Sequence, residues 1–139
     1  GLKTLHIRMQ RHCENATEIA NYLKKHPKIE KVYWPGFEDH PNHKVAKAQM
    51  KDFGGMLSFV TKGADYDAAI KIVEKLKIFT LAESLGGVES LAGHPASMTH
   101  ASIPKTLREK SGVVDALVRL SIGIEDVRDL IADLEQAIG

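Results

Sequence analysis

The stretch ESLGGVESLAGHPASMTH, residues 83–100, carries three kinds of side chain that do chemistry in proteins: hydroxyls, carboxylates and imidazoles. Ser84 and Thr99 supply hydroxyls, and the Gly-Gly pair that follows Leu85 allows the backbone to approach a ligand closely. The spacing of that pair matches neither a dinucleotide-binding loop nor a phosphate-binding loop. The stretch therefore indicates either the wall of a binding pocket or a mobile polar connection.

The spacing of the serine and histidine residues does not favour a serine hydrolase or a metal site. Ser84 lacks the G-x-S-x-G turn that exposes the nucleophile of a serine hydrolase. Two histidine pairs, at positions 40 and 43 and at 94 and 100, have no third ligand at metal-site spacing and are flanked by proline or asparagine. We therefore expect no metal site in this chain.

Arg119 lies in a run, LVRLSIG, whose apolar residues alternate as in a strand with one buried face. The face that bears Val118 and Leu120 is expected to meet the core, so Arg119 is expected to point away from it. On an uncovered sheet face, its guanidinium has a planar fork of donors that suits a carboxylate. The alternative interpretation is a solvated arginine on a half-exposed sheet.

The elements that must position these residues alternate between strand-like and helix-like patterns. Strands interleaved with helices predict an α/β (α+β) sandwich, in which helices cover one face of a small, mostly antiparallel sheet. Strands are expected at 31–34, 55–61, 78–82 and 117–123, and helices up to residue 26, at 43–51, from 65 or 67 to 76, at 104–110 and from 126 onward.

Composition limits the chain to one domain and a few function classes. Its 139 residues, 43% of them hydrophobic, can form one core but not two domains of ordinary size. The net charge is +1 and the basic residues are scattered, which speaks against nucleic acid as a partner. No apolar run is long enough for a membrane span. The single cysteine, Cys13, falls on an apolar helix face, where it is interpreted as structural, and fits a cytoplasmic protein.

The first residues predict a fragment. Gly1 opens directly into a helical pattern with no initiator methionine, and that helix is longer than most helices that begin a small domain. We therefore expect residues 1–26 to join this domain, 1–139, to a larger domain that is missing here.

Two long motifs carry a resemblance to a known family. The segments LAESLGGVESLAGHPASMTHASIP and LVRLSIGIEDVRDLIADLEQAI closely resemble the C-terminal domain of the pyridoxal-phosphate enzymes of cysteine and methionine metabolism, the transsulfuration family. The upstream segments GLKTLHIRM, YWPGFEDHPNHKVAKAQM and GGMLSFV follow the order of the same family. The resemblance covers nearly the whole chain.

The resemblance implies the small C-terminal domain of an aspartate-aminotransferase-like enzyme of fold type I. Its cofactor, pyridoxal 5'-phosphate, would be bound mainly by the missing N-terminal domain and would stabilise negative charge at the substrate α-carbon. Arg119 of VRLS would clamp the α-carboxylate of a sulfur amino acid, Ser84 of SLGG would lie near the cofactor and its lysine, and Thr99 of MTH would lie beside the pocket. The full-length enzyme would be a homotetramer.

Glu83 bears on which member of the family this chain resembles. The residue before that serine is a glutamate in the cystathionine γ-synthases and γ-lyases, whereas typical methionine γ-lyases have an apolar residue there. A carboxylate at this position can pair with the distal ammonium of cystathionine, which methionine lacks. The resemblance therefore favours γ-elimination or γ-replacement on cystathionine, with methionine γ-lyase as an alternative, and it does not separate synthase from lyase.

The departures from the family matter as well. Its Schiff-base lysine, its phosphate-binding residues and its stacking aromatic ring are not recognisable in this chain, and Lys62, although it follows a threonine, is interpreted as a turn residue. We therefore predict that this chain holds no catalytic residue and is inactive alone. Two alternatives are a stand-alone regulatory module that binds an amino acid through Arg119, and a structural oligomerisation domain.

Overall fold

The computed structural model describes residues 1–63 and 65–139. Its elements are η1 (Leu2–Thr4), α1 (Leu5–Lys25), β1 (Ile29–Tyr33), α2 (His43–Gln49), β2 (Met56–Thr61), α3 (Tyr66–Lys75), β3 (Thr80–Leu81), β4 (Leu91–Gly93), α4 (Lys105–Lys110), β5 (Leu117–Ser121) and α5 (Val127–Ile138). Within the described ranges no helix is long and apolar enough to cross a membrane.

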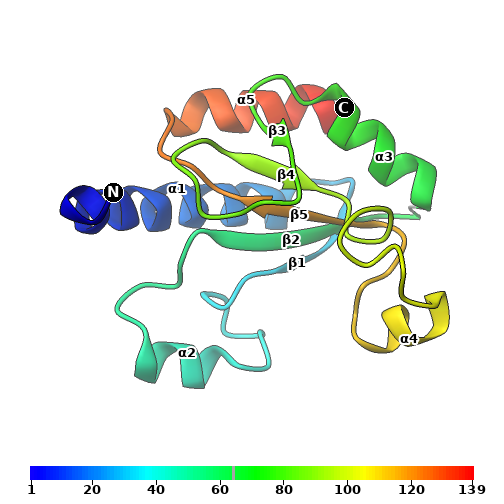
Figure 1. The fold of residues 1–139 in the computed structure, drawn as a ribbon, viewed down its shortest axis with the longest axis horizontal. Helices are drawn as coiled ribbons and strands as arrows, with labels where there is room; N and C mark the ends of the chain where they lie inside the picture. Colours follow the sequence, from blue (N-terminus) through cyan, green and yellow to red (C-terminus); the bar gives the residue numbers. More distant parts are fainter. Residues whose placement is uncertain (64) are drawn as a thin grey trace.

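The strands form one sheet in the order β1-β2-β5-β4-β3. The pairs β1–β2, β2–β5 and β4–β5 are antiparallel, and only β3 and β4, at one edge, run parallel. The prediction of a small, mostly antiparallel sheet is therefore confirmed. The last strand of the chain, β5, lies in the middle of the sheet (Figure 1).

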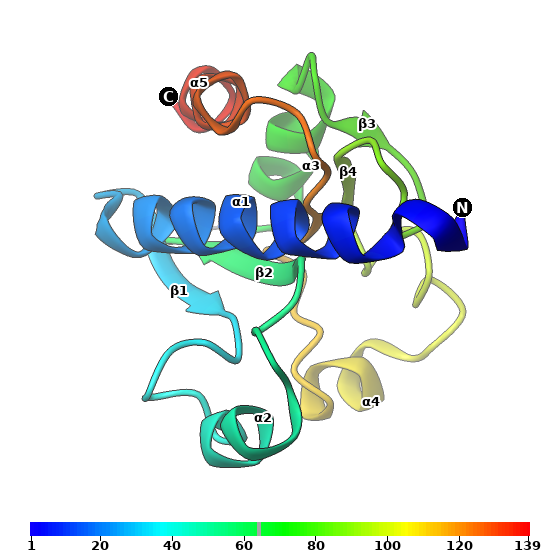
Figure 2. The same cartoon turned by 90° about the vertical axis from the view of Figure 1, so that its left-hand side faces the viewer.

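Three helices cover one face of the sheet. Figure 2 shows α1 crossing beside the strands with α5 next to it, while α2 and α4 project away from this layer; α3 packs against α5. The helices place apolar side chains such as Ile19, Ile72 and Leu134 against Phe59 and Leu120 of the sheet, and all five are at most 7% exposed. The core is thus the space between one sheet face and three amphipathic helices, as the sequence predicts.

The helix boundaries follow local chemistry. The helix α1 ends immediately before His26 and Pro27, and a proline cannot continue a helical hydrogen-bond pattern. Asp65 caps α3, because its carboxylate accepts a hydrogen bond from the Ala68 backbone at 3.0 Å. Asp126 caps α5 in the same way, through the backbone N–H of Arg128. These helix boundaries agree with the predicted ones to within a residue or two.

A buried carboxylate joins α5 to the segment that enters β3. Asp133 is 4% exposed, and its carboxylate accepts hydrogen bonds from the backbone N–H groups of Lys77, Ile78 and Phe79 at 2.8 to 3.1 Å. Burial raises the pKa of Asp133, but these backbone hydrogen bonds, together with one from the Gln136 side chain, lower it by more, so that its pKa lies below the ordinary value. The start of the sheet edge is thereby fixed to the last helix.

The sequence prediction was wrong in two places along this edge. The strand expected at 78–82 is reduced to Thr80–Leu81, and the stretch 83–100, treated as a loop throughout, contains β4. All three residues of β4 are buried and none is polar, so the strand shows no alternation that a pattern search could find. A smaller difference is that Pro104 caps α4 rather than opening it.

Candidate functional site

Arg119 lies at the centre of the sheet, opposite Ser58 of β2 and Gly93 of β4. Its neighbours Val118 and Leu120 are fully buried in the core, whereas Arg119 is partly exposed on the other face. The predicted direction of its side chain is therefore confirmed. The expectation that this face is uncovered is wrong, because Ser121 on the same side is only 3% exposed.

The loop that follows β3 covers this face. Gly86 donates its backbone N–H to the Ser121 hydroxyl at 2.8 Å, and Ile124 donates its N–H to the carbonyl of Val88 at 2.9 Å. Gly86 has φ of 75°, a conformation that favours glycine, and so allows the chain to turn back over β5. Gly86 thus allows the loop after β3 to lie over β5, the strand that carries Arg119.

The guanidinium of Arg119 is held at one end and free at the other. Its Nη2 donates to the backbone carbonyls of Glu83 and Ser84 at 3.1 and 3.2 Å. Its Nε is buried and has no hydrogen-bond partner among residues 1–63 and 65–139. A buried donor without a partner costs about 1–3 kcal/mol, so the remaining donors favour an incoming acceptor such as a carboxylate.

A narrow pocket lies beside this guanidinium, too tight in this structure to hold even a water molecule. Whole small-molecule ligands generally occupy pockets of about 300–1,000 Å³, so the side chains around this one would have to separate before a ligand group could enter. Its walls come from the end of β3, from β4 and the turn after it, and from β5; the lining residues are Ala82, Glu83, Gly93, His94, Pro95, Met98, Thr99 and Arg119.

The structure brings together three of the four residues singled out in the sequence. Glu83, Thr99 and Arg119 all line the pocket, and the Thr99 hydroxyl lies 2.8 Å from Nδ1 of His100. Ser84 lies next to them, but it contacts Arg119 through its backbone carbonyl and its side chain is not part of the lining. The contribution of Ser84 to this site is therefore made by its main chain.

Sequence reasoning missed the floor of the pocket. His94 was weighed only as a metal ligand, yet it is fully buried in the lining, where it binds Ser97 and the backbone of Asp115. Gly93 faces Arg119 across the sheet, and a Cβ there would lie 3.2 Å from the carbonyl of Ala82. The run LAGHP is too apolar for a surface loop, and it could have indicated that both residues are buried.

The other candidates take structural places. In the part of the chain that the structure describes, no three histidine, cysteine, aspartate or glutamate side chains gather where they could hold a metal ion. Lys62 is exposed in the turn after β2, as predicted. Cys13 is half-buried on α1; burial raises the pKa of its thiol, and the nearby carboxylates of Asp52 and Glu14 act in the same direction, so at neutral pH the thiol stays protonated.

The small sheet with its helical layer on one face has the fold of the small domain of aspartate-aminotransferase-like enzymes of fold type I. Residues 1–139 match the model of the Cys/Met metabolism PLP-dependent enzymes, and the chain belongs to that family.

Relatives agree with this assignment along the whole chain. It is 57% identical over 138 residues to cystathionine beta-lyase of Coxiella burnetii and 55% identical to L-methionine gamma-lyase of Fusobacterium nucleatum subsp. polymorphum. The crystal structure of cystathionine gamma-lyase from Lactobacillus plantarum complexed with L-serine superposes with a TM-score of 0.91 at 49% identity. Each match covers 99% of this chain and 35% of the other protein, so the chain spans about a third of the length of its relatives.

The family implies pyridoxal phosphate for the full-length enzyme. Beside Arg119 the described residues offer an unpaired buried N–H, and the narrow pocket there has no room for an aromatic ring with its phosphate. The donors of Arg119 therefore suit a carboxylate rather than the cofactor itself.

Proposed function

We propose that this chain is the substrate-binding C-terminal domain of a pyridoxal-phosphate-dependent enzyme that acts on a sulfur amino acid. The observation that carries the proposal is the guanidinium of Arg119, whose Nη2 is held by two backbone carbonyls while its Nε is buried and unpartnered among the described residues, beside a narrow pocket. The family membership of residues 1–139 supplies the cofactor class. The larger domain would hold the cofactor and its lysine, and the coverage of 35% of each relative supports such a domain.

In this proposal Arg119 binds and orients the substrate. Its Nη2 stays on the carbonyls of Glu83 and Ser84, so the plane of the guanidinium is fixed before the substrate arrives. The α-carboxylate then accepts from the free donors of the fork, which sets the direction of the bonds at the α-carbon. Pyridoxal phosphate, when bound, would withdraw electrons from that carbon.

The exposed carboxylate of Glu83 would set the preference for the far end of the substrate. Glu83 lines the pocket and its side chain is exposed, so it can meet the distal ammonium of a molecule such as cystathionine. We propose γ-elimination or γ-replacement on that class of substrate. The names of the relatives include lyases of cystathionine and of methionine, which supports a sulfur amino acid as the common substrate.

The test is cofactor attachment. The 139-residue chain and a version extended upstream to the natural start are each incubated with pyridoxal phosphate and then reduced with borohydride, which makes an imine bond permanent. We expect one stoichiometric adduct on the extended chain and none at a specific site on the 139-residue chain, measured by intact mass.

Other outcomes would contradict the proposal in different ways. A specific single-site adduct on the 139-residue chain would show that one of its own lysines, Lys62 first among them, holds the cofactor. The absence of an adduct from both chains would indicate that the protein is a binding or structural module rather than an enzyme.

A further inference from the structure

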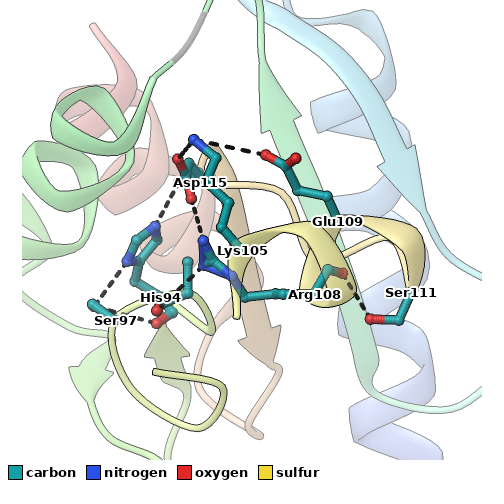
Figure 3. A network of polar contacts seen from close by, with 8 residues as sticks. His94, Ser97, Lys105, Arg108, Glu109, Ser111 and Asp115 are labelled. Atoms are coloured by element: carbon teal, nitrogen blue, oxygen red, sulfur yellow. Dashed lines mark hydrogen bonds and ion pairs between the residues drawn. The ribbon is translucent and has the colours of Figure 1, made fainter. Parts of the chain in front are cut away.

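A partly buried ion pair, formed by residues outside the lining of the Arg119 pocket, lies beside His94 (Figure 3). Arg108 of α4 donates from Nη2 to a carboxylate oxygen of Asp115 at 2.6 Å, and the two side chains are 8% and 22% exposed. A second cation, Lys105, contacts the other oxygen of the same carboxylate but is 60% exposed. Removing one partner of a buried pair is far more disruptive than removing an exposed one.

The pair is connected to the pocket through His94. The backbone carbonyl of Asp115 accepts a hydrogen bond from Nε2 of His94 at 2.6 Å, and Nδ1 of the same ring lies 2.8 Å from the Ser97 hydroxyl. Figure 3 shows the ring between the two contacts, with Arg108 beside it. Because His94 is fully buried, its ring has no freedom to follow a different set of partners.

The wall of the pocket is built on the same histidine. Its backbone carbonyl accepts from the N–H groups of Ser97 and Met98 at 3.2 and 3.1 Å, and its own N–H contacts the Met98 sulfur at 3.3 Å. Met98 and Thr99 then face Arg119 across the pocket. A displacement of the His94 backbone would therefore move Ser97 and Met98, and with them the wall of the pocket.

We propose that the Arg108–Asp115 pair, acting through His94, positions the Met98–Thr99 wall and so determines how tightly the Arg119 pocket holds a carboxylate. This inference rests on the proposed function of Arg119. Arg108, Asp115 and His94 are positioning residues, since none of them has to touch the reacting atoms. The pair should affect binding of the carboxylate and leave the chemical step almost unchanged.

The experiment uses the full-length holoenzyme and propionate, a carboxylate without an amine, as a competitive probe. In Arg108→Gln we expect KM for the amino acid and the inhibition constant of propionate both to rise on the order of tenfold, with kcat changed by less than about twofold. Arg108→Lys should recover part of the loss. Lys105→Gln, the matched exposed control on the same carboxylate, should change all three by less than about twofold.

Ser97→Ala keeps the test decisive if Arg108→Gln does not fold, because it removes a partner of His94 without touching the ion pair. Unchanged KM and propionate inhibition in a folded variant of either residue would overturn the inference, and so would a fall of kcat alone. Failure of the proposed function has a separate signature. In that case Arg119→Lys itself would leave propionate inhibition unchanged.

Discussion

Replacing Arg119 with alanine in the full-length enzyme is expected to lower kcat/KM roughly 30- to 4,000-fold, since truncating a buried, hydrogen-bonded charge contact costs about 2–5 kcal/mol. The substrate carboxylate would lose its fork of donors, and the carbonyls of Glu83 and Ser84 would lose the N–H that holds the loop. Arg119→Lys keeps the charge but not the two-pronged geometry, so we expect most of the loss to remain. Steady-state kinetics with an amino acid substrate measures both effects.

Arg128→Ala is the matched control for this variant. Arg128 is 87% exposed and pairs only with the neighbouring carboxylate of Asp126 in the described structure, so its removal should leave kcat/KM unchanged. If Arg119→Ala and Arg128→Ala gave the same kcat/KM as the parent enzyme, Arg119 would be the solvated arginine that the sequence also allows.

Replacing Asp133 with alanine is expected to lower the free energy of unfolding of this domain by about 3 kcal/mol, because hydrogen bonds to a buried charge are worth about 1.5–3 kcal/mol and three N–H groups share this carboxylate. Those of Lys77, Ile78 and Phe79 would be left unpaired where the chain enters β3. Asp133→Asn keeps one acceptor oxygen, so a smaller loss of about 1–2 kcal/mol is expected. Urea denaturation of the 139-residue chain at neutral pH measures both.

The pH dependence of that loss gives a second check. The folded-state pKa of Asp133 is lowered, so its stabilisation is present above the unfolded pKa of about 3.9 and is lost as pH falls through the folded value. The gap between parent and Asp133→Asn should therefore shrink below about pH 4. Asp129→Asn, an exposed aspartate on the same helix, is the control and should show no such gap. A gap that stays constant to low pH would contradict the assignment.

The sequence predicted the long helices and the central strand of this domain better than the short strands at the edge of its sheet. Long amphipathic stretches such as α1 and α5 and the alternating run of β5 have strong periodicity, so their types and nearly all of their limits were correct. The two-residue β3 and three-residue β4 carry no periodicity; β4 forms because β5, late in the chain, offers it a partner, and β3 pairs in turn with β4. Such strands are defined by tertiary pairing rather than by local preference.

The charged side chain of the site could be predicted from the sequence, but the residues that hold it in place could not. The alternation around Arg119 gave the direction of the guanidinium, and the resemblance gave Glu83 and Thr99, both of which line the pocket. The backbone contact of Ser84 with Arg119 could not be predicted, because any residue type can supply a backbone carbonyl. His94 was missed because the sequence alone does not distinguish a buried histidine that makes two hydrogen bonds from a histidine that binds a metal ion.

The position of β5 has a consequence for the order in which a ribosome makes this domain. Arg119 is separated from the two carbonyls that hold it by 36 and 35 residues, and its strand fills the place between β2 and β4. Every earlier strand leaves the ribosome before β5 does, with the edges of β2 and β4 that face the gap still unpaired. A nascent chain that stops short of residue 117 therefore lacks both β5 and Arg119. The pocket around Arg119 can assemble only after β5 has left the ribosome.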